Sequence, residues 1–154
     1  MDHEGYYETL AEIESVVSKF ENCSFLKEEF THARHLTVAA YYLGQFSSAE
    51  SLERMREALL RFTRHHGVTG YHETITRFWL LLTEDFLRQS RGECFVNQVN
   101  ALIDSYGRKD VLFEYYSREL VTSVEARNKW IEPDLKQIGL EKIGVDRQKS
   151  KLNG

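Results

Sequence analysis

A glutamate and two histidines follow one another at steps of three in the segment Glu29-Phe30-Thr31-His32-Ala33-Arg34-His35. On a helix, side chains three positions apart lie on the same side, so those of Glu29 and His32 would converge. Carboxylate-bridged iron and manganese proteins present two ligands in this way, as Glu-x-x-His on an inward-facing helix. A two-metal site needs a second copy of the spacing, which the sequence lacks. The pattern therefore predicts a site for a single metal ion.

Glu29 is the most informative of these residues because of the helical face on which it falls. At about 100° per residue, one face of a helix over about 24–43 is defined by its apolar residues, which are Phe25, Leu26, Phe30, Ala33, Leu36, Ala40 and Leu43. Glu29 falls near the middle of this face, His32 toward its edge, and His35 well round toward solvent. A carboxylate in an apolar stripe is costly unless it is paired, protonated or bound to a metal. We therefore expect Glu29 to pair with an arginine or a tyrosine hydroxyl, or to bind a metal ion.

His72 opens the helix expected over about 71–89 and lies on the flank of its apolar face. With Glu29 and His32 it would supply two imidazoles and one carboxylate, the open-sided ligand set of mononuclear non-haem iron sites. His35 as a further nitrogen ligand would give a histidine-rich site of the zinc type. The predicted metal ligands are therefore Glu29, His32, His72 and His35, with iron or zinc as the cofactor. The alternative for His32 and His72 is a half-buried imidazole with satisfied hydrogen bonds, and the alternative for His35 is an exposed residue.

Three functions are compatible with these residues. The predicted ligands favour a metal-dependent enzyme acting on a small-molecule substrate, by oxidation with iron or by hydrolysis with zinc. Residues 39–62 resemble one helical-hairpin repeat of the tetratricopeptide type, which favours a non-catalytic protein-interaction module, although a solenoid needs about three such repeats. The aromatic run Phe113-Glu114-Tyr115-Tyr116, with Trp130 nearby, favours a small-molecule-binding protein with an apolar pocket.

Helices must position these residues, because apolar side chains recur at steps of three and four and no strand-like alternation occurs. Glycines fall mostly between the periodic segments, and the single proline, Pro133, ends them. The patterns Ser47-Ser48-Ala49-Glu50 and Thr122-Ser123-Val124-Glu125 are typical of capping boxes at helix starts. The predicted helices span about 6–20, 24–43, 47–66, 71–89, 93–106, 110–116 and 122–130.

The predicted fold is an all-α, compact single-domain bundle of about five to seven helices over residues 1–138. A polar, loosely ordered tail is expected over 139–154. A chain of 154 residues can bury roughly 70% of its unfolded surface without disulfides or a structural metal. The helix at 71–89 is apolar around most of its circumference, so we expect it at the centre. A second subunit could cover the same surface, and a homo-oligomer is therefore a further expectation.

The composition of the chain limits the classes of binding partner and the cellular location that we expect. A net charge of −4 argues against nucleic acid, whose binders usually carry a basic excess. The longest apolar stretch, Phe78-Trp79-Leu80-Leu81-Leu82, is far shorter than the roughly 20 residues of a membrane-spanning helix, so no membrane partner is expected. The first twenty residues are acidic rather than basic at their start, unlike a secretory signal, and Cys23 and Cys94 occur outside any CxxC motif. These features predict a cytoplasmic protein with reduced thiols.

Overall fold

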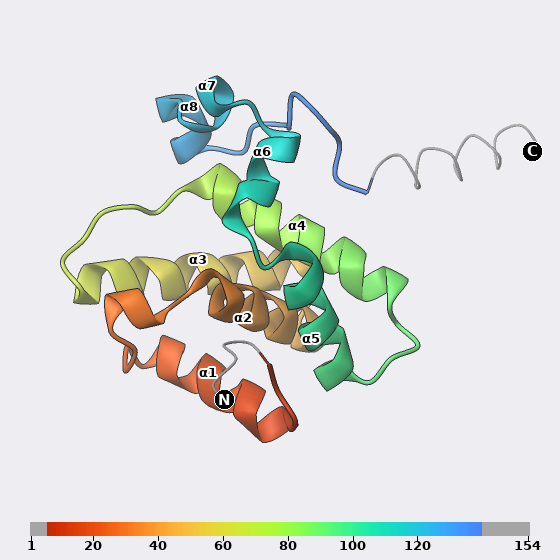
Figure 1. Ribbon diagram of the computed structural model, residues 1–154. Coiled ribbons are helices and arrows are strands. Elements are labelled where there is room, and N and C mark those ends of the chain that lie inside the picture. Colours follow the sequence, from red (N-terminus) through yellow and green to blue (C-terminus); the bar gives the residue numbers. More distant parts are fainter. Residues whose placement is uncertain (1–5, 140–154) are drawn as a thin grey trace, which may run out of the picture.

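The computed structural model describes residues 6–139, and within them the chain is built from helices joined by short turns, without a strand (Figure 1). The elements are α1 (Leu10–Glu21), η1 (Lys27–Glu29), α2 (His32–Gln45), α3 (Ser48–His65), α4 (Glu73–Gln89), α5 (Phe95–Tyr106), η2 (Lys109–Val111), α6 (Leu112–Tyr115), α7 (Arg118–Val121) and α8 (Val124–Asn128). The all-α prediction is confirmed. Apart from Gly139, the predicted polar tail lies outside the described residues.

Hydroxyl side chains begin most of the helices, because they accept hydrogen bonds from backbone N–H groups that have no partner in the first turn. Thr9 forms a full capping box with Glu12 at the start of α1, and Ser47 accepts from the backbone N–H of Glu50 at 3.1 Å. The capping box predicted at Thr122 does not form. Ser123 alone caps α8, while the Thr122 hydroxyl donates to the Arg118 carbonyl at 2.6 Å and ends α7. The predicted helix over 122–130 is therefore only the short α8, and α7 lies in a segment where no helix is predicted.

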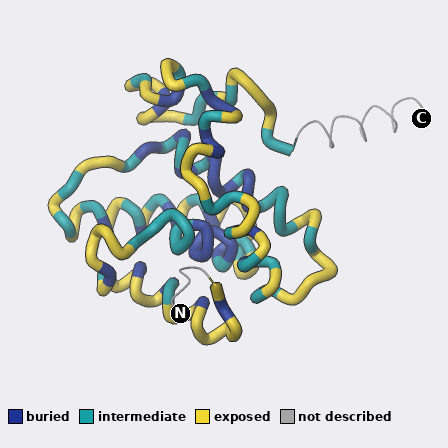
Figure 2. Tube along the Cα trace, in the orientation of Figure 1, coloured by how far each residue is buried: buried dark blue, intermediate teal, exposed yellow. Residues whose placement is uncertain are grey.

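Two helices share the centre of the fold. α2 packs against α1, α3, α4 and α5, and α4 packs against α2, α3, α5 and α8. The buried stretches of the trace follow these two helices in Figure 2. In the middle of α2, the five consecutive residues 36–40 are fully buried, and the alanines among them leave room for close neighbours. The prediction that α4 is central therefore holds only together with α2.

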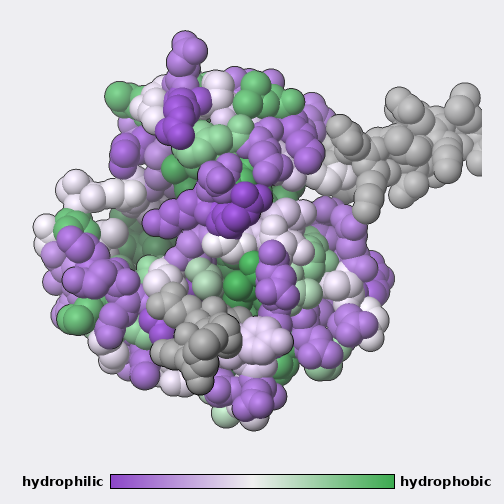
Figure 3. Space-filling view, in the orientation of Figure 1, coloured by the Kyte–Doolittle hydropathy of each residue, from purple (hydrophilic) through white to green (hydrophobic). Residues whose placement is uncertain are grey.

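Neighbouring side chains form two buried clusters. The larger one joins α4 to α5 and to the short C-terminal helices through Phe78, Leu82, Leu102 and Tyr116. The smaller joins α1, α2 and α3 through residues that include Phe20, Phe25, Met55 and Phe62. In Figure 3 one face of the molecule is mostly hydrophilic, with hydrophobic residues recessed near its centre. Within the described residues, no helix is long and apolar enough to span a bilayer.

Candidate functional site

Glu29 lies in the turn η1, ahead of α2, and its side chain is exposed. Its Oε1 atom accepts a hydrogen bond of 2.7 Å from the backbone N–H of Leu26 and so caps this turn. The prediction that Glu29 lies in a core-facing helical stripe was wrong. The hydroxyl of Thr31 accepts from the backbone N–H of Arg34 at 3.4 Å, and α2 begins only at His32. The angular count of a continuous helix does not extend back across this cap.

His72 is the residue that caps α4. Its Nδ1 accepts from the backbone N–H of Ile75 at 3.1 Å, and its Nε2 lies 2.7 Å from the carbonyl oxygen of Val121. A carbonyl only accepts, so the proton is on Nε2 and both ring nitrogens are used. Burial lowers the pKa of His72, which favours this neutral form. His72 is therefore an imidazole with both hydrogen bonds satisfied, which is the alternative to a metal ligand.

His32 and His35 come from the first turn of α2, and their rings lie 6.4 Å apart between centroids. The Nε2 of His32 donates to the carbonyl of Tyr106 at 3.1 Å, and its ring meets that of Trp79 edge-on at 4.3 Å. The Nε2 of His35 is buried and, within the described chain, has no hydrogen-bond partner. Buried polar atoms of this kind are rare in folded proteins.

The expectation that His35 faces solvent was wrong. Phe30, in the turn before α2, lies 5.9 Å from the His35 ring between centroids. The segment 109–113 covers the same region, because Lys109, Leu112 and Phe113 line a cavity together with His35. The sequence of α2 alone does not indicate that Phe30 and the segment 109–113 will cover His35.

This cavity, which we call the histidine cavity, has a volume of about 420 Å³. Its wall is contributed by α2, α3, α4 and the segment 109–113, and by the turn before α2. Most of the lining side chains are apolar or aromatic, and the complete lining is Phe30, Thr31, His32, His35, Leu59, Ile75, Trp79, Lys109, Leu112 and Phe113. Of the aromatic run predicted to shape a pocket, Phe113 lies here, while Tyr115 and Tyr116 belong to the buried core.

Both imidazoles of the cavity are uncharged at neutral pH. Burial lowers the pKa of His35 to about 3, and the charge of Lys109, together with that of His32 when it is protonated, adds to the effect. Burial also lowers the pKa of His32, against the opposing effect of its hydrogen bond to Tyr106, and the charge of Lys109 lowers it further. Since Nε2 of His32 carries the proton, its Nδ1 is left as an acceptor. The cavity thus presents two neutral imidazoles and one ammonium group.

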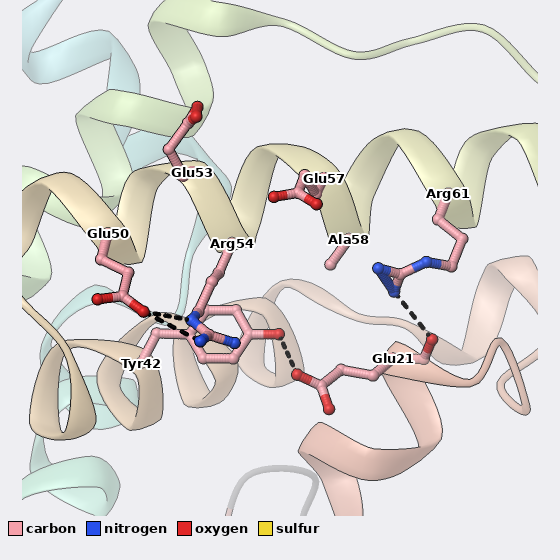
Figure 4. Close-up of a pocket in the computed structure, with 8 residues that line it drawn as sticks. All are labelled: Glu21, Tyr42, Glu50, Glu53, Arg54, Glu57, Ala58 and Arg61. Atoms are coloured by element: carbon pink, nitrogen blue, oxygen red, sulfur yellow. Dashed lines mark hydrogen bonds and ion pairs between the residues drawn. The ribbon is translucent and has the colours of Figure 1, made fainter.

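A second recess, of about 450 Å³, lies between α1, α2 and α3 and is lined mainly by charged side chains (Figure 4). Its polar groups are largely paired with one another. The Tyr42 hydroxyl donates to Glu21 Oε2 at 2.6 Å, Arg61 donates to the Glu21 carbonyl at 3.1 Å, and Arg54 pairs with Glu50 at 3.0 Å. The two contacts of Glu21 join the three helices, and the pair of Arg54 with Glu50 lies within α3. The histidine cavity differs from this recess in having a buried polar atom without a partner, and we take it as the candidate site for that reason.

The structure brings two of the four predicted metal ligands together, His32 and His35, and places Glu29 and His72 elsewhere. Within residues 6–139, no three histidine, cysteine, aspartate or glutamate side chains form a group that could hold a metal ion. The iron or zinc site stays a prediction. Comparison of the chain with known protein families, with curated proteins and with solved structures finds no match.

Three further residues that line the cavity, Lys109, Leu59 and Ile75, carry no distinguishing pattern in the sequence. Leu59 and Ile75 look like ordinary core positions of amphipathic helices. Lys109 looks like a solvated lysine in a turn. The sequence relates Lys109 to the cavity only indirectly, because Lys109 shortly precedes the aromatic run that contains Phe113.

Proposed function

We propose that the chain is a small-molecule-binding protein whose histidine cavity takes an apolar ligand carrying one polar group. The observation that supports this most directly is the buried Nε2 of His35, which has no partner within the described chain. A buried polar atom without a partner costs about 1–3 kcal/mol. A ligand that hydrogen-bonds this nitrogen recovers that free energy, which gives the cavity a preference for one kind of occupant.

The size and lining of the cavity indicate the dimensions of the ligand. Small-molecule sites typically measure about 300–1,000 Å³ and are mostly apolar with a few polar groups, and the histidine cavity, at about 420 Å³, falls in this range. An apolar cavity of about 150 Å³ holds benzene. We therefore expect a ligand of about two or three fused or linked rings, or an alkyl chain of similar volume, packed against Trp79 and Phe113.

The proposal is tested with N-phenyl-1-naphthylamine, an uncharged dye whose fluorescence rises in apolar sites. We expect saturable binding of one dye molecule per chain. Leu59→Trp fills part of the cavity and should weaken dye binding by about tenfold or more, as expected when about 1.4 kcal/mol of binding free energy is lost. Leu60→Trp is the matched control, because Leu60 is the exposed neighbour on α3 and does not line the cavity. Equal affinities of the two variants for the dye would contradict the proposal. So would a native protein that binds neither the dye nor 2-naphthoate.

A metal-dependent enzyme with a small-molecule substrate is our second proposal, and it draws support from the two imidazoles on one wall. Within the described chain, His32 Nδ1 and His35 Nε2 take part in no hydrogen bond and could bind iron or zinc, with further ligands from water or substrate. Elemental analysis of untagged protein tests this. We expect stoichiometric metal in the native protein and loss of the metal in His32→Ala. His72→Ala is the control and should keep the metal, because both ring nitrogens of His72 are already hydrogen-bonded. Metal-free native protein that also binds no added iron or zinc would contradict it.

A cytoplasmic location is part of the same proposal. Cys23 is half-buried and Cys94 exposed, and both are free thiols, as is usual where thiols are kept reduced. Association into a homo-oligomer remains an expectation from the sequence.

A further inference from the structure

The histidine cavity contains one ammonium group and, within the described part of the chain, no carboxylate. Lys109 is the first residue of η2 and the one lysine or arginine of the lining. Its acidic neighbours are engaged elsewhere, since Asp110 pairs with Arg108 at 3.5 Å and Glu114 with Arg108 at 3.9 Å. Among residues 6–139 no ion pair forms at Lys109. Its charge is therefore available to a ligand.

The positive charge of Lys109 acts on the interior of the cavity. It is close enough to lower the pKa of both His32 and His35. Other charged groups near this end of α2 are directed to different partners: Arg34 stacks over the Phe25 ring at 4.9 Å, and the Glu29 carboxylate accepts from Leu26. A cavity with one cation and neutral imidazoles attracts an anion and repels a second cation.

We infer that the ligand of the histidine cavity is an apolar monocarboxylic acid, with its carboxylate between Lys109 and His35 and its apolar body against Trp79, Ile75 and Phe113. This inference rests on the proposed function and specifies its ligand class. No hydrogen bond within the described chain fixes the tautomer of His35 at Nε2. This nitrogen can therefore carry the proton and donate to a carboxylate oxygen while the ring remains neutral. Lys109, which is exposed to solvent, supplies the opposite charge.

Three ligands that share one ring system and differ only in charge test the inference. They are 2-naphthoate, 2-naphthylmethanol and 2-naphthylmethylammonium, each measured at pH 7.5 by displacement of N-phenyl-1-naphthylamine. We expect naphthoate to bind about tenfold more tightly than the alcohol, as for a charge-assisted hydrogen bond and ion pair, and the ammonium compound to bind most weakly. Lys109→Gln should reduce naphthoate affinity to that of the alcohol, with each variant's affinities compared with its own affinity for the dye. Lys109→Arg should retain most of the preference for the acid.

Arg108→Gln is the matched control, because it removes the same charge from the adjacent position without removing a lining residue. It should leave the order of the three ligands unchanged. The inference is overturned if the alcohol binds as tightly as the acid, or if Lys109→Gln weakens all three ligands equally. In either case, dye binding by the native protein still supports the proposed function. If the dye does not bind, naphthoate is titrated directly by calorimetry. Absence of binding there overturns the inference together with the proposed function.

Discussion

His35→Phe is expected to stabilise the ligand-free protein at pH 7, by about 1–3 kcal/mol, because it replaces a buried nitrogen without a partner by apolar atoms of similar shape. The Nε2 of His35 is enclosed by the walls of the histidine cavity and has no hydrogen-bond partner within the described residues. The same replacement should weaken binding of 2-naphthoate, because the ligand loses a donor. Stability and ligand binding therefore change in opposite directions, as is expected of a residue retained for binding rather than for packing.

The pH dependence of stability gives the same variant a second and larger effect. In the unfolded chain a histidine has a pKa near 6.5, whereas burial lowers that of folded His35 to about 3. Between these values the unfolded state binds a proton that the folded state does not, so the free energy of unfolding falls as pH falls. The full effect of such a shift is on the order of 5 kcal/mol. His32 and His72, whose pKa values burial also lowers, act in the same direction.

Urea unfolding at pH 7, 6, 5 and 4 measures this effect. Carboxylates with a lowered pKa, such as Glu73 beside Arg56, add acid destabilisation to both proteins. The difference between the native protein and His35→Phe therefore isolates the contribution of His35. We expect the variant to lose less stability on acidification, so that the gap between the curves widens below pH 6.5. Parallel curves would show that the His35 ring is accessible to protons in the folded state.

The long helices could be predicted from the sequence because their signals are local. Thr9 with Glu12, and Ser47 ahead of Glu50, are capping patterns that the structure uses where they occur. The start of α2 was misplaced because its cap is only half of such a pattern. Thr31 is followed three positions later by Arg34, which cannot return the bond as a glutamate would. Without a glutamate three positions after Thr31, the sequence around it does not separate α2 from the preceding turn.

The apolar residues before α2 made the misplaced start more convincing. Phe25 is buried, and Phe30 stacks on Phe20 with 4.2 Å between ring centroids, so both residues do enter the core. They reach it from an irregular segment whose hydrophobic spacing happens to match a helix. Glu29 lies between them in sequence and faces outward because η1 is a tight turn. Hydrophobic spacing thus predicted that Phe25 and Phe30 enter the core, but it was wrong for Leu26, which is 58% exposed, and it misplaced Glu29.

The histidine cavity could not be predicted because its wall is assembled from distant segments. His32 meets the carbonyl of Tyr106, 74 positions along the chain, and Lys109 follows in the next turn. The face of a single helix reports the polarity of its own residues and does not report which segment will cover them. The structure brings His32 and His35 to one cavity, and their role as metal ligands stays a prediction. The ligands expected beside them, Glu29 and His72, are used as local caps instead.

Thr74→Val and Thr83→Val should change stability in opposite directions, although both remove one hydroxyl from a fully buried threonine of α4. The Thr74 hydroxyl donates to the Lys129 carbonyl at 2.7 Å and accepts from the backbone N–H of Ile131 at 3.1 Å. Valine at this position leaves two backbone groups without partners, and each costs about 1–3 kcal/mol. We expect Thr74→Val to lower the free energy of unfolding by about 2–5 kcal/mol.

Thr83 is the matched control because its hydroxyl has no hydrogen-bond partner within the described chain. Valine there removes a desolvated polar atom at constant shape, so Thr83→Val should be neutral or stabilising by about 1 kcal/mol. Urea unfolding measures both variants, and Thr74→Ser, which keeps the hydroxyl, should recover much of the loss. Amide hydrogen exchange should locate the Thr74→Val effect at residues 129–131, where the chain returns to α4. Equal losses for the two valine variants would mean that the Thr74 bonds do not attach this segment, and that shape alone decides at both positions.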